Sequence, residues 1–431
     1  MYAGIDNVDI IYFGLFPWDN PYSSVSLSFT RAFAKKNRVF YINPPFTVKE
    51  IVQQIGTKAV QTRLVDQVLR KTRYEKIPNL PSNVIAVHPP AILPINFLSK
   101  GSLYDKLHYW NNKVIYHTIA QVIEKYQLKN YIYLNCFNPF VGGVLPKNFR
   151  PQLNIYQCID DMTQEDYTAK HWAGLEEKVI QDADLVFVTS KKLHQLKSPL
   201  NPQTHILHNA VDENIFRRTL EVVYPKPEEI EHIETPIIGF TGNMDASRID
   251  YPLLKAIAET HKDKTLVLVG PTNNEEYKEI GLDKMPNVIF TGRKDINELP
   301  QYLQHFDCTI IPFLKNELTA SIYPLKINEY LFSGRPVIST NFSEDIRSFK
   351  SVVHLADNHA EFVQQIDNAL EDNDADKIQA RVNTARSNTW THRVEEFWSV
   401  VNRHLDRTKK NTSKNRMKKK RSQDLSERVG E

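Results

Sequence analysis

The chain has 431 residues, of which 41% are hydrophobic and 24% charged, and its formal net charge is +3. This length predicts two domains rather than a single domain with one core. No apolar run reaches about 18 residues, so the sequence predicts no membrane-spanning helix. Three widely separated cysteines offer neither a disulfide framework nor a metal-ligand spacing. Residues 1–6 lack the pattern of a secretory signal, so we expect a cytoplasmic protein.

The N-terminal half predicts alternating strands and helices. Apolar segments predict strands at 9–14, 38–43, 84–88, 131–135, 153–157 and 185–189, with helices between them, for instance at 24–36 and 111–126. Buried strands separated by amphipathic helices are typical of a parallel sheet covered on both faces. The pattern therefore predicts a Rossmann-like domain over residues 1–220. A proline-rich and acidic segment near 214–234 is the expected linker.

The C-terminal half repeats this pattern with shorter loops. Strands are expected at 236–242, 265–271, 287–292, 308–313 and 337–339, and helices at 251–259, 298–305 and around 326–329. This predicts a second Rossmann-like domain over residues 235–385, and an α/β protein of two doubly wound lobes with a cleft between them. Ligands of such sheets bind beyond the carboxyl ends of the strands, where Gly242, Gly270, Gly292 and the 314–324 loop are expected.

The chain ends in an amphipathic helix at 390–405 and a basic tail at 406–431. Residues 403–431 contain eleven basic and four acidic residues, a net charge of +7, which leaves −4 for residues 1–402. The tail has almost nothing apolar to bury, so we expect it to be disordered. It could attract an anionic membrane surface or simply remain solvated, whereas nucleic-acid binding is disfavoured because no aromatic residues interleave with the charges.

The segment 321–340 predicts a loop, a short helix and a buried strand in immediate succession. Pro324 suits the opening of a helix, and Gly334 and Pro336 end it. Lys326 and Glu329 then lie on one helical face, near an N-terminus that favours phosphate. A diphosphate on this helix start and a ribose chelated by Glu329 would hold a nucleoside diphosphate. The plain alternative is a surface Lys–Glu pair on an ordinary helix.

The same segment, Pro324-Leu325-Lys326 followed by Glu329-Tyr330-Leu331 and Gly334, Pro336 and Val337, resembles the nucleotide-sugar signature of retaining GT-B glycosyltransferases of the family-four group. The segments 16–18, 38–45, 156–161, 184–190 and 208–216 are similar to the N-terminal lobe of bacterial exopolysaccharide and teichuronic-acid-type enzymes. The signature of that family contains two glutamates, the first eight residues before the second, and Glu329 matches the second. Here Ser321 stands at that position, and Glu317 and Thr319 are the nearby substitutes.

The resemblance implies a role for each matching position. Gly242, Asn243 and Gly270 would border the donor diphosphate, and Arg293 the base, while Ser321 would lie near the sugar. Arg248 and Lys326 would be the catalytic cations that stabilise the leaving diphosphate without an obligatory metal, so no cofactor is expected. Glu329 would bind the ribose. The helix at 386–405 would brace the N-terminal lobe, as in similar GT-B proteins.

The acceptor side is assigned to His117, Asn138 and Asp161, with a structural hydrogen-bonding role as the plain alternative for each. The resemblance implies two partners. One is a nucleotide-sugar donor, expected to be a UDP-sugar, and the other is a polysaccharide or lipid-linked acceptor at the inner face of the plasma membrane. A nucleotide-sugar 2-epimerase and a catalytically inactive binding scaffold remain open. The chain has no dinucleotide-binding glycine fingerprint, no phosphate-binding P-loop and no nucleophile elbow, which disfavours hydride transfer, NTP hydrolysis and serine hydrolysis.

Overall fold

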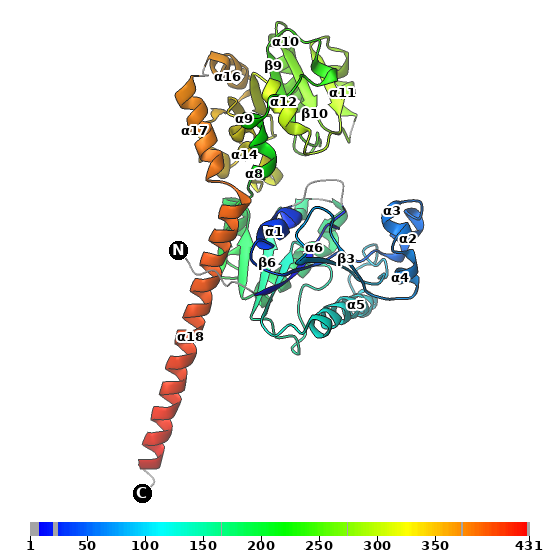
Figure 1. Cartoon of the computed structure of the whole chain (residues 1–431), viewed down its shortest axis with the longest axis vertical. Coiled ribbons are helices and arrows are strands. Elements are labelled where there is room, and N and C mark those ends of the chain that lie inside the picture. Colours follow the sequence, from blue (N-terminus) through cyan, green and yellow to red (C-terminus); the bar gives the residue numbers. More distant parts are fainter. Residues whose placement is uncertain (1–7, 20–24, 165, 274, 372–373, 429–431) are drawn as a thin grey trace.

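The fold, seen in a computed structural model, consists of two lobes and one long C-terminal helix (Figure 1). The structure describes residues 8–428 except 20–24, 165, 274 and 372–373. Within these residues, no helix is both long enough and apolar enough to cross a membrane. Each lobe is built around one sheet, and the two sheets have separate hydrophobic cores.

The N-terminal sheet has the strand order β3-β4-β2-β1-β5-β6-β7-β8. Its strands pair in parallel except β3, which runs antiparallel to β4 at the edge. The strands are β1 (Asp9–Gly14), β2 (Val39–Ile42), β3 (Arg73–Lys76), β4 (Val84–His88), β5 (Tyr131–Cys136), β6 (Leu153–Cys158), β7 (Leu185–Val188) and β8 (Thr204–Ile206). Its helices are α1 (Val25–Phe33), α2 (Val48–Gln53), α3 (Lys58–Gln61), α4 (Leu64–Val68), α5 (Ser102–Tyr126), the short 3-10 helix η1 (Met162–Gln164), α6 (Asp166–Asp182) and α7 (Lys191–Lys197).

Alternate residues of the central strand enter different cores, as the period of two in a strand requires. Ile11 and Phe13 of β1 pack with Ile115 and Ile119 of α5 on one face of the sheet. The intervening Ile10 and Tyr12 belong to the core on the other face, which α1 and the C-terminal helix cover. Both faces are therefore buried, as the continuous apolar strands predict.

The C-terminal sheet has the order β11-β10-β9-β12-β13-β14, and all its strands pair in parallel. The strands are β9 (Ile237–Thr241), β10 (Thr265–Val269), β11 (Val288–Gly292), β12 (Cys308–Ile311), β13 (Val337–Thr340) and β14 (His354–Ala356). The helices are α10 (Tyr251–Thr260), α11 (Glu276–Glu279), η3 (Leu282–Lys284), α12 (Leu299–His305), α13 (Glu317–Ala320), α14 (Leu325–Phe332), α15 (Glu344–Arg347), α16 (His359–Glu371) and α17 (Ala375–Arg386). These elements follow the predicted βα pattern.

The expected linker is not an open connection. It contains α8 (Glu213–Phe216), α9 (Arg218–Glu221) and η2 (Glu228–Ile230). Phe216, Ile230 and Ile233 are buried in the core of the C-terminal lobe. The segment therefore belongs structurally to the second lobe, because its apolar residues have a surface there to cover.

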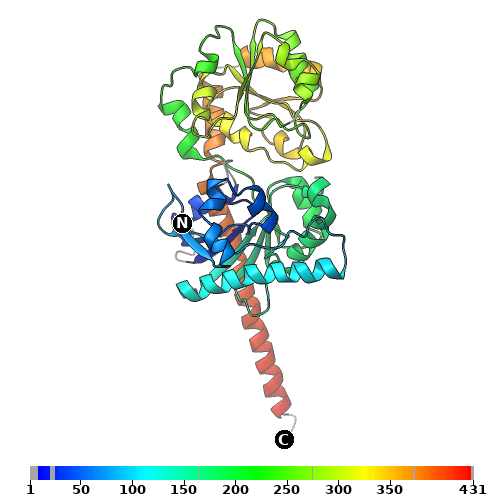
Figure 2. The ribbon, with the colours of Figure 1, turned by 90° about the vertical axis from the view of Figure 1, so that its right-hand side faces the viewer.

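The long helix α18 (Trp390–Arg428) returns to the N-terminal lobe (Figures 1 and 2). Its Trp390 ring lies edge-on to Phe29 of α1 at 4.8 Å, and its Phe397 ring lies edge-on to Phe33 at 5.0 Å. Residues 406–428 continue this helix, although the sequence predicts a disordered tail. Because no glycine or proline occurs between Trp390 and Arg428, nothing in the backbone ends the helix that packing has begun.

The chain crosses between the lobes twice, and the two crossings lie side by side. Val211 on the first crossing donates its backbone N–H to the carbonyl of Asn388 at 3.0 Å, and its own carbonyl accepts from the backbone of Trp390 at 3.3 Å. An ion pair of 2.6 Å between Arg31 of α1 and Asp212 lies at the same place.

Candidate active site

Helix α14 has the predicted position and is fixed firmly to the second sheet. Pro324 is its N-cap residue, and Gly334 follows its C-cap with a positive φ of 74°. Tyr330 is fully buried, and its hydroxyl oxygen accepts a hydrogen bond of 2.8 Å from the backbone N–H of Thr241, at the end of β9. The helix therefore brings its first turn to the carboxyl end of the central strand.

The ammonium group of Lys326 lies against the turn that follows β9. Gly242 has a φ of +136°, and a Cβ added to it would lie 2.6 Å from both Cε and Nζ of Lys326. Among the described residues, no carboxylate forms an ion pair with this half-buried ammonium group. Burial lowers the pKa of Lys326, an effect that Glu329 opposes and the charge of Arg248 reinforces. A cation held in this way would gain from a bound anion.

Gly270 closes the same turn from the neighbouring strand. It has a φ of +146°, and an added Cβ would lie 1.9 Å from the carbonyl oxygen of Gly242, so only glycine fits there. Arg248 follows this turn with its backbone bonded to Asp245 and Leu314. Its Nε is buried and has no hydrogen-bond partner among the described residues. Both cations assigned to the leaving group therefore have hydrogen-bonding capacity to spare.

Glu329 lies one turn after Lys326 and is half-buried. Burial raises the pKa of its carboxyl group to about 7, against the opposing charge of Lys326. The carboxylate is therefore held where water solvates it poorly, at a cost that a ligand with hydroxyl groups would reduce. Such perturbed carboxyl groups are typical of binding and active sites.

The other residues assigned to the donor side have different environments. Asn243 is exposed and its side-chain oxygen accepts from Asn273 at 3.0 Å, while Arg293 is exposed at the end of β11. Ser321 is fully buried, and its hydroxyl donates to the carbonyl of Leu318 at 2.7 Å. Its side chain is therefore occupied within α13 and its C-cap.

Neither proposed substitute for the missing glutamate is turned toward Lys326. Glu317 forms a 3.1 Å ion pair with Lys192 of the N-terminal lobe, and its side chain is largely exposed. Thr319 is buried and donates its hydroxyl to the carbonyl of Leu314. None of Glu317, Thr319 and Ser321 therefore takes the place of the first glutamate of the family signature in this structure.

The carboxyl ends of the two sheets face one another. Asn209, after β8, donates its side-chain amide to the carbonyl of Tyr323 at 3.0 Å, and the His208 ring stacks on Tyr323 at 4.5 Å. The backbone N–H of Lys191, after β7, donates to Asp345 at 3.0 Å. Sequence reasoning matched the 208–216 segment to the family but did not predict that it holds the lobes together next to α14.

Two of the three residues assigned to the acceptor side lie at this edge, in structural roles. Asn138, after β5, donates its side-chain amide to the carbonyl of Gly14, and its side-chain oxygen accepts from Val141. Asp161, after β6, accepts from both the backbone and the hydroxyl of Thr163. Their side chains hold the loops that border the edge.

His117 is not at this edge. It is exposed on α5 and forms a 3.1 Å contact with Gln121, whose oxygen accepts from Thr72. Both views show α5 on the side of the N-terminal lobe that faces away from the second lobe (Figures 1 and 2). The assignment of His117 to the acceptor side was therefore wrong, because helical periodicity does not say which exposed face meets the other lobe.

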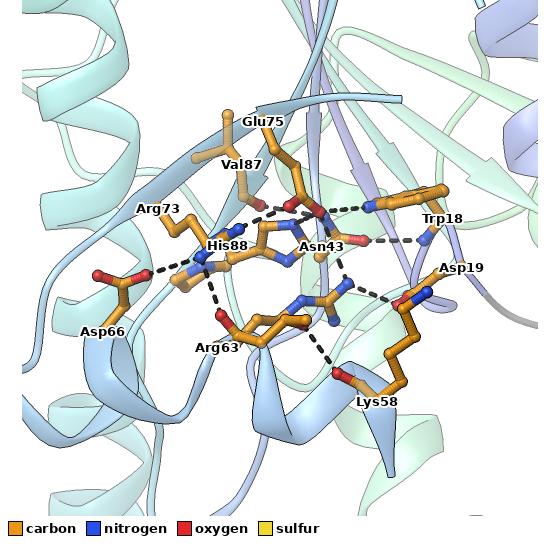
Figure 3. A network of polar contacts seen from close by, with 12 residues as sticks. Trp18, Asp19, Asn43, Lys58, Arg63, Asp66, Arg73, Glu75, Val87 and His88 are labelled. Carbon is orange, nitrogen blue, oxygen red and sulfur yellow. Dashed lines mark hydrogen bonds and ion pairs between the residues drawn. The ribbon is translucent and has the colours of Figure 1, made fainter. Parts of the chain in front are cut away.

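A partly buried polar network, which the sequence did not predict, lies at the carboxyl ends of β1, β2 and β4 (Figure 3). Glu75 accepts from the indole of Trp18 at 3.0 Å and from Nε2 of His88 at 2.6 Å, and it lies 3.7 Å from Arg63. Arg63 also pairs with Asp19 at 2.6 Å. The hydrogen bond from His88 is the main reason why the pKa of Glu75 falls to about 2, while burial lowers the pKa of His88.

Among the described residues, no three histidine, cysteine, aspartate or glutamate side chains are grouped so that they could hold a metal ion. What the site presents is a pair of cations with a carboxyl group beside a glycine turn. Such a set can bind the diphosphate and a hydroxyl-bearing part of a nucleotide.

Comparison with known proteins relates the C-terminal lobe to one family and the two-lobed arrangement to one fold. Residues 235–372 match the family described as "Glycosyl transferases group 1", and the fold is GT-B. The match of the C-terminal domain and the two-lobed fold agree with the resemblance seen in the sequence.

One curated relative is TuaH of Bacillus subtilis (strain 168), provisionally designated a teichuronic acid biosynthesis glycosyltransferase. It is 28% identical over 224 residues, which cover 50% of this chain and 56% of TuaH, so the chain matches little more than half of that relative's length.

Solved structures similar in fold cover nearly the whole chain. Sucrose-phosphate synthase from Thermosynechococcus elongatus has a TM-score of 0.62 at 14% identity, covering 92% of this chain and 98% of its own. The E. coli trehalose-6-phosphate protein bound with UDP-2-fluoro glucose has a TM-score of 0.63 at 10% identity, with 90% and 98% covered. Anabaena Alr3699/HepE in complex with UDP and glucose has a TM-score of 0.56 at 15% identity, with 90% and 99% covered.

Proposed function

We propose that this protein transfers a sugar from a UDP-sugar to a polysaccharide or lipid-linked acceptor, with retention of configuration. The observation that carries the proposal is the Lys326 ammonium group, which has no ion-pair partner among the described residues and lies against Gly242 at the carboxyl end of β9. Structures of the same fold that hold UDP-2-fluoro glucose, or UDP and glucose, support UDP as the nucleotide.

The reaction breaks the bond between the anomeric carbon and the diphosphate oxygen, and the electron pair leaves with that oxygen. Lys326 and Arg248 would stabilise the negative charge that develops there, which is the role of preorganised cations in such transition states. Glu329 would accept hydrogen bonds from the ribose hydroxyls. The acceptor oxygen then bonds to the anomeric carbon and passes its proton to the released diphosphate. With two cations in place, no metal is required.

The designation of TuaH supports a cell-envelope polymer as the product. We place the enzyme in the cytoplasm, peripheral at the inner face of the plasma membrane. Attraction between the basic residues of 403–428 and anionic lipids is one source of that association.

Titration calorimetry with UDP, GDP and ADP tests the binding site. We expect UDP to bind. Lys326→Ala and Glu329→Ala should each lower the affinity for UDP about tenfold or more, because each removes a charge-assisted contact. Lys255→Ala and Glu259→Ala are matched controls, because this i,i+4 pair is exposed on α10. Equal affinity in all four variants would contradict the site.

Turnover tests the reaction. Release of UDP from UDP-sugars should require an added acceptor and should survive EDTA. An epimer formed from donor alone would favour the 2-epimerase. The buried Ser321, whose hydroxyl is already bonded to Leu318, favours one further candidate, an inactive binding scaffold; tight UDP binding with no turnover on any acceptor would support it.

A further inference from the structure

Helices α2–α4 expose apolar side chains at one edge of the N-terminal lobe. None of the α2 residues is buried. Val48 and Val52 are 49% and 68% exposed and lie one turn apart on one side of α2, and Ile55, just after its C-cap, is 55% exposed. Val65 and Leu69, on and after α4, are 68% and 55% exposed at a spacing of four. The rest of the described chain thus leaves five aliphatic residues within 22 positions exposed to solvent.

The charged residues of this surface have one sign. Every exposed charged residue from 47 to 71 is basic: Lys49, Lys58, Arg70 and Lys71. Glu50 and Asp66, the two acidic residues of this segment, are half-buried and engaged. Glu50 accepts from the backbone N–H and hydroxyl of Thr47, and Asp66 pairs with Arg73 at 3.3 Å. The outward face therefore combines aliphatic groups with uncompensated positive charge.

An aromatic pair on α5 extends this surface. Tyr109 and Trp110 are 57% and 60% exposed, and the ammonium group of Lys113 lies 4.8 Å and 5.0 Å from their ring centroids. The neighbouring Asn111 bonds to both backbone groups of Leu93. The carbonyl of Ile92, the residue before Leu93, accepts from the backbone N–H of Val48, so the part of α5 that carries Tyr109 and Trp110 is linked to the start of α2. Figure 2 shows α5 and α2–α4 on the same side of the lobe.

The surface is held rigidly. Arg63, which links α3 to α4, is 3% exposed and joins this segment to Asp19 and Glu75 in the network of Figure 3. Gln67 of α4 donates to the carbonyl of Pro89 at 3.1 Å. The apolar side chains are therefore presented by a fixed platform beside the carboxyl ends of β1, β2 and β4.

We propose that this lipid surface, made of Val48, Val52, Ile55, Val65 and Leu69 with their basic neighbours and Tyr109–Trp110, docks the protein on a bilayer that contains anionic lipid. Aliphatic side chains enter the headgroup boundary, lysines and arginines meet anionic headgroups, and aromatic rings lie at the interface. A second copy of this chain fits less well, because its four exposed cations would meet four like charges.

The basic end of α18 lies elsewhere. Both views place α18 on the side of the N-terminal lobe opposite α2–α4 (Figures 1 and 2). Docking through the lipid surface therefore differs from docking through the tail, and the two can be separated by substitution. Docking through the lipid surface also does not require that the protein bind UDP.

Co-sedimentation of the full chain with vesicles tests the proposal, using phosphatidylcholine alone or mixed with phosphatidylglycerol. We expect binding to the mixed vesicles, and a loss of about tenfold or more in the partition coefficient for Val52→Glu with Ile55→Glu, which brings two negative charges to the interface. Val223→Glu is the matched control, because Val223 is 93% exposed on the segment that belongs to the other lobe. Lys49→Gln with Lys71→Gln should remove the preference for phosphatidylglycerol.

Three results would overturn the proposal. One is unchanged vesicle binding in Val52→Glu with Ile55→Glu. Another is binding abolished by glutamine at Lys418, Lys419, Lys420 and Arg421 alone, which would assign it to the tail. The third is a concentration-dependent dimer, detected by light scattering, that the same Val52 and Ile55 variant abolishes. UDP titration of each variant separates these outcomes from failure of the donor site, because intact UDP binding shows that the fold is retained.

Discussion

Lys326 and Gly242 are in direct contact, with the lysine side chain filling the space that any residue larger than glycine would need at position 242. Gly242→Ala would push the ammonium group away and force alanine to a φ of +136°. We expect a loss of UDP affinity of about tenfold or more and a decrease in the free energy of unfolding of about 1–3 kcal/mol. Titration calorimetry and urea denaturation measure the two effects.

Gly281→Ala is the matched control for this variant. Gly281 also has a positive φ, 72°, but an added Cβ would meet no atom within 4 Å. It should lower stability and leave UDP affinity unchanged. If Gly281→Ala weakened UDP binding as much as Gly242→Ala does, backbone strain and not the lysine contact would explain the loss.

Glu329 should make stability depend on pH between its ordinary pKa of 4.5 and its folded value of about 7. The folded protein binds this proton more tightly than the unfolded chain, so the free energy of unfolding is highest below pH 4.5 and falls as the pH rises to about 7. Glu329→Gln removes this loss. In urea denaturation, the free energy of unfolding of the variant should rise relative to that of the parent protein from pH 5 to about pH 8. A difference between the two that does not change with pH would contradict the burial of the carboxyl group.

Glu75 stabilises the N-terminal lobe by satisfying two buried groups, Arg63 and His88. Glu75→Ala would remove the hydrogen-bond partner of His88 and leave Arg63 with Asp19 alone, and we expect a cost of about 1–3 kcal/mol in urea denaturation. Because the pKa of Glu75 is lowered to about 2, its contribution is present above pH 4.5 and is lost as the pH falls toward 2. Glu124→Ala, on the exposed side of α5, should change stability little.

Phe397 joins α18 to the N-terminal lobe. Its ring is 2% exposed and lies edge-on to Phe33 at 5.0 Å, and its centroid is 4.9 Å from that of Phe187. Phe397→Ala should lower the free energy of unfolding by about 3–5 kcal/mol, as other large-to-small core substitutions do. Glu395→Ala, exposed on the same helix, is the control. Similar stability of the two variants would mean that α18 does not brace the lobe.

The sequence predicted the elements whose strands are continuous apolar runs. β1, β9 and β10 are buried along nearly their whole length, so hydrophobicity alone located them. β3 was missed because Arg73–Lys76 contains no apolar run and pairs only at the sheet edge. β8 and β14 are three residues each, and sequence periodicity does not detect elements of that length.

The candidate site could be predicted where its residues are close in sequence. Lys326 and Glu329 follow from a spacing of three on one helix. The contact of Lys326 with Gly242 joins positions far apart along the chain, and the network around Glu75 depends on the strand order β3-β4-β2. No local pattern encodes such contacts.

The paired crossings at Val211 and Asn388 also limit how the lobes can move. A single connecting segment would let one lobe rotate freely relative to the other, but two connecting segments joined by backbone hydrogen bonds resist twisting. We therefore expect any opening and closing of the lobes to be a swing about the paired crossings, which would return Lys326 and the N-terminal edge to the same mutual alignment.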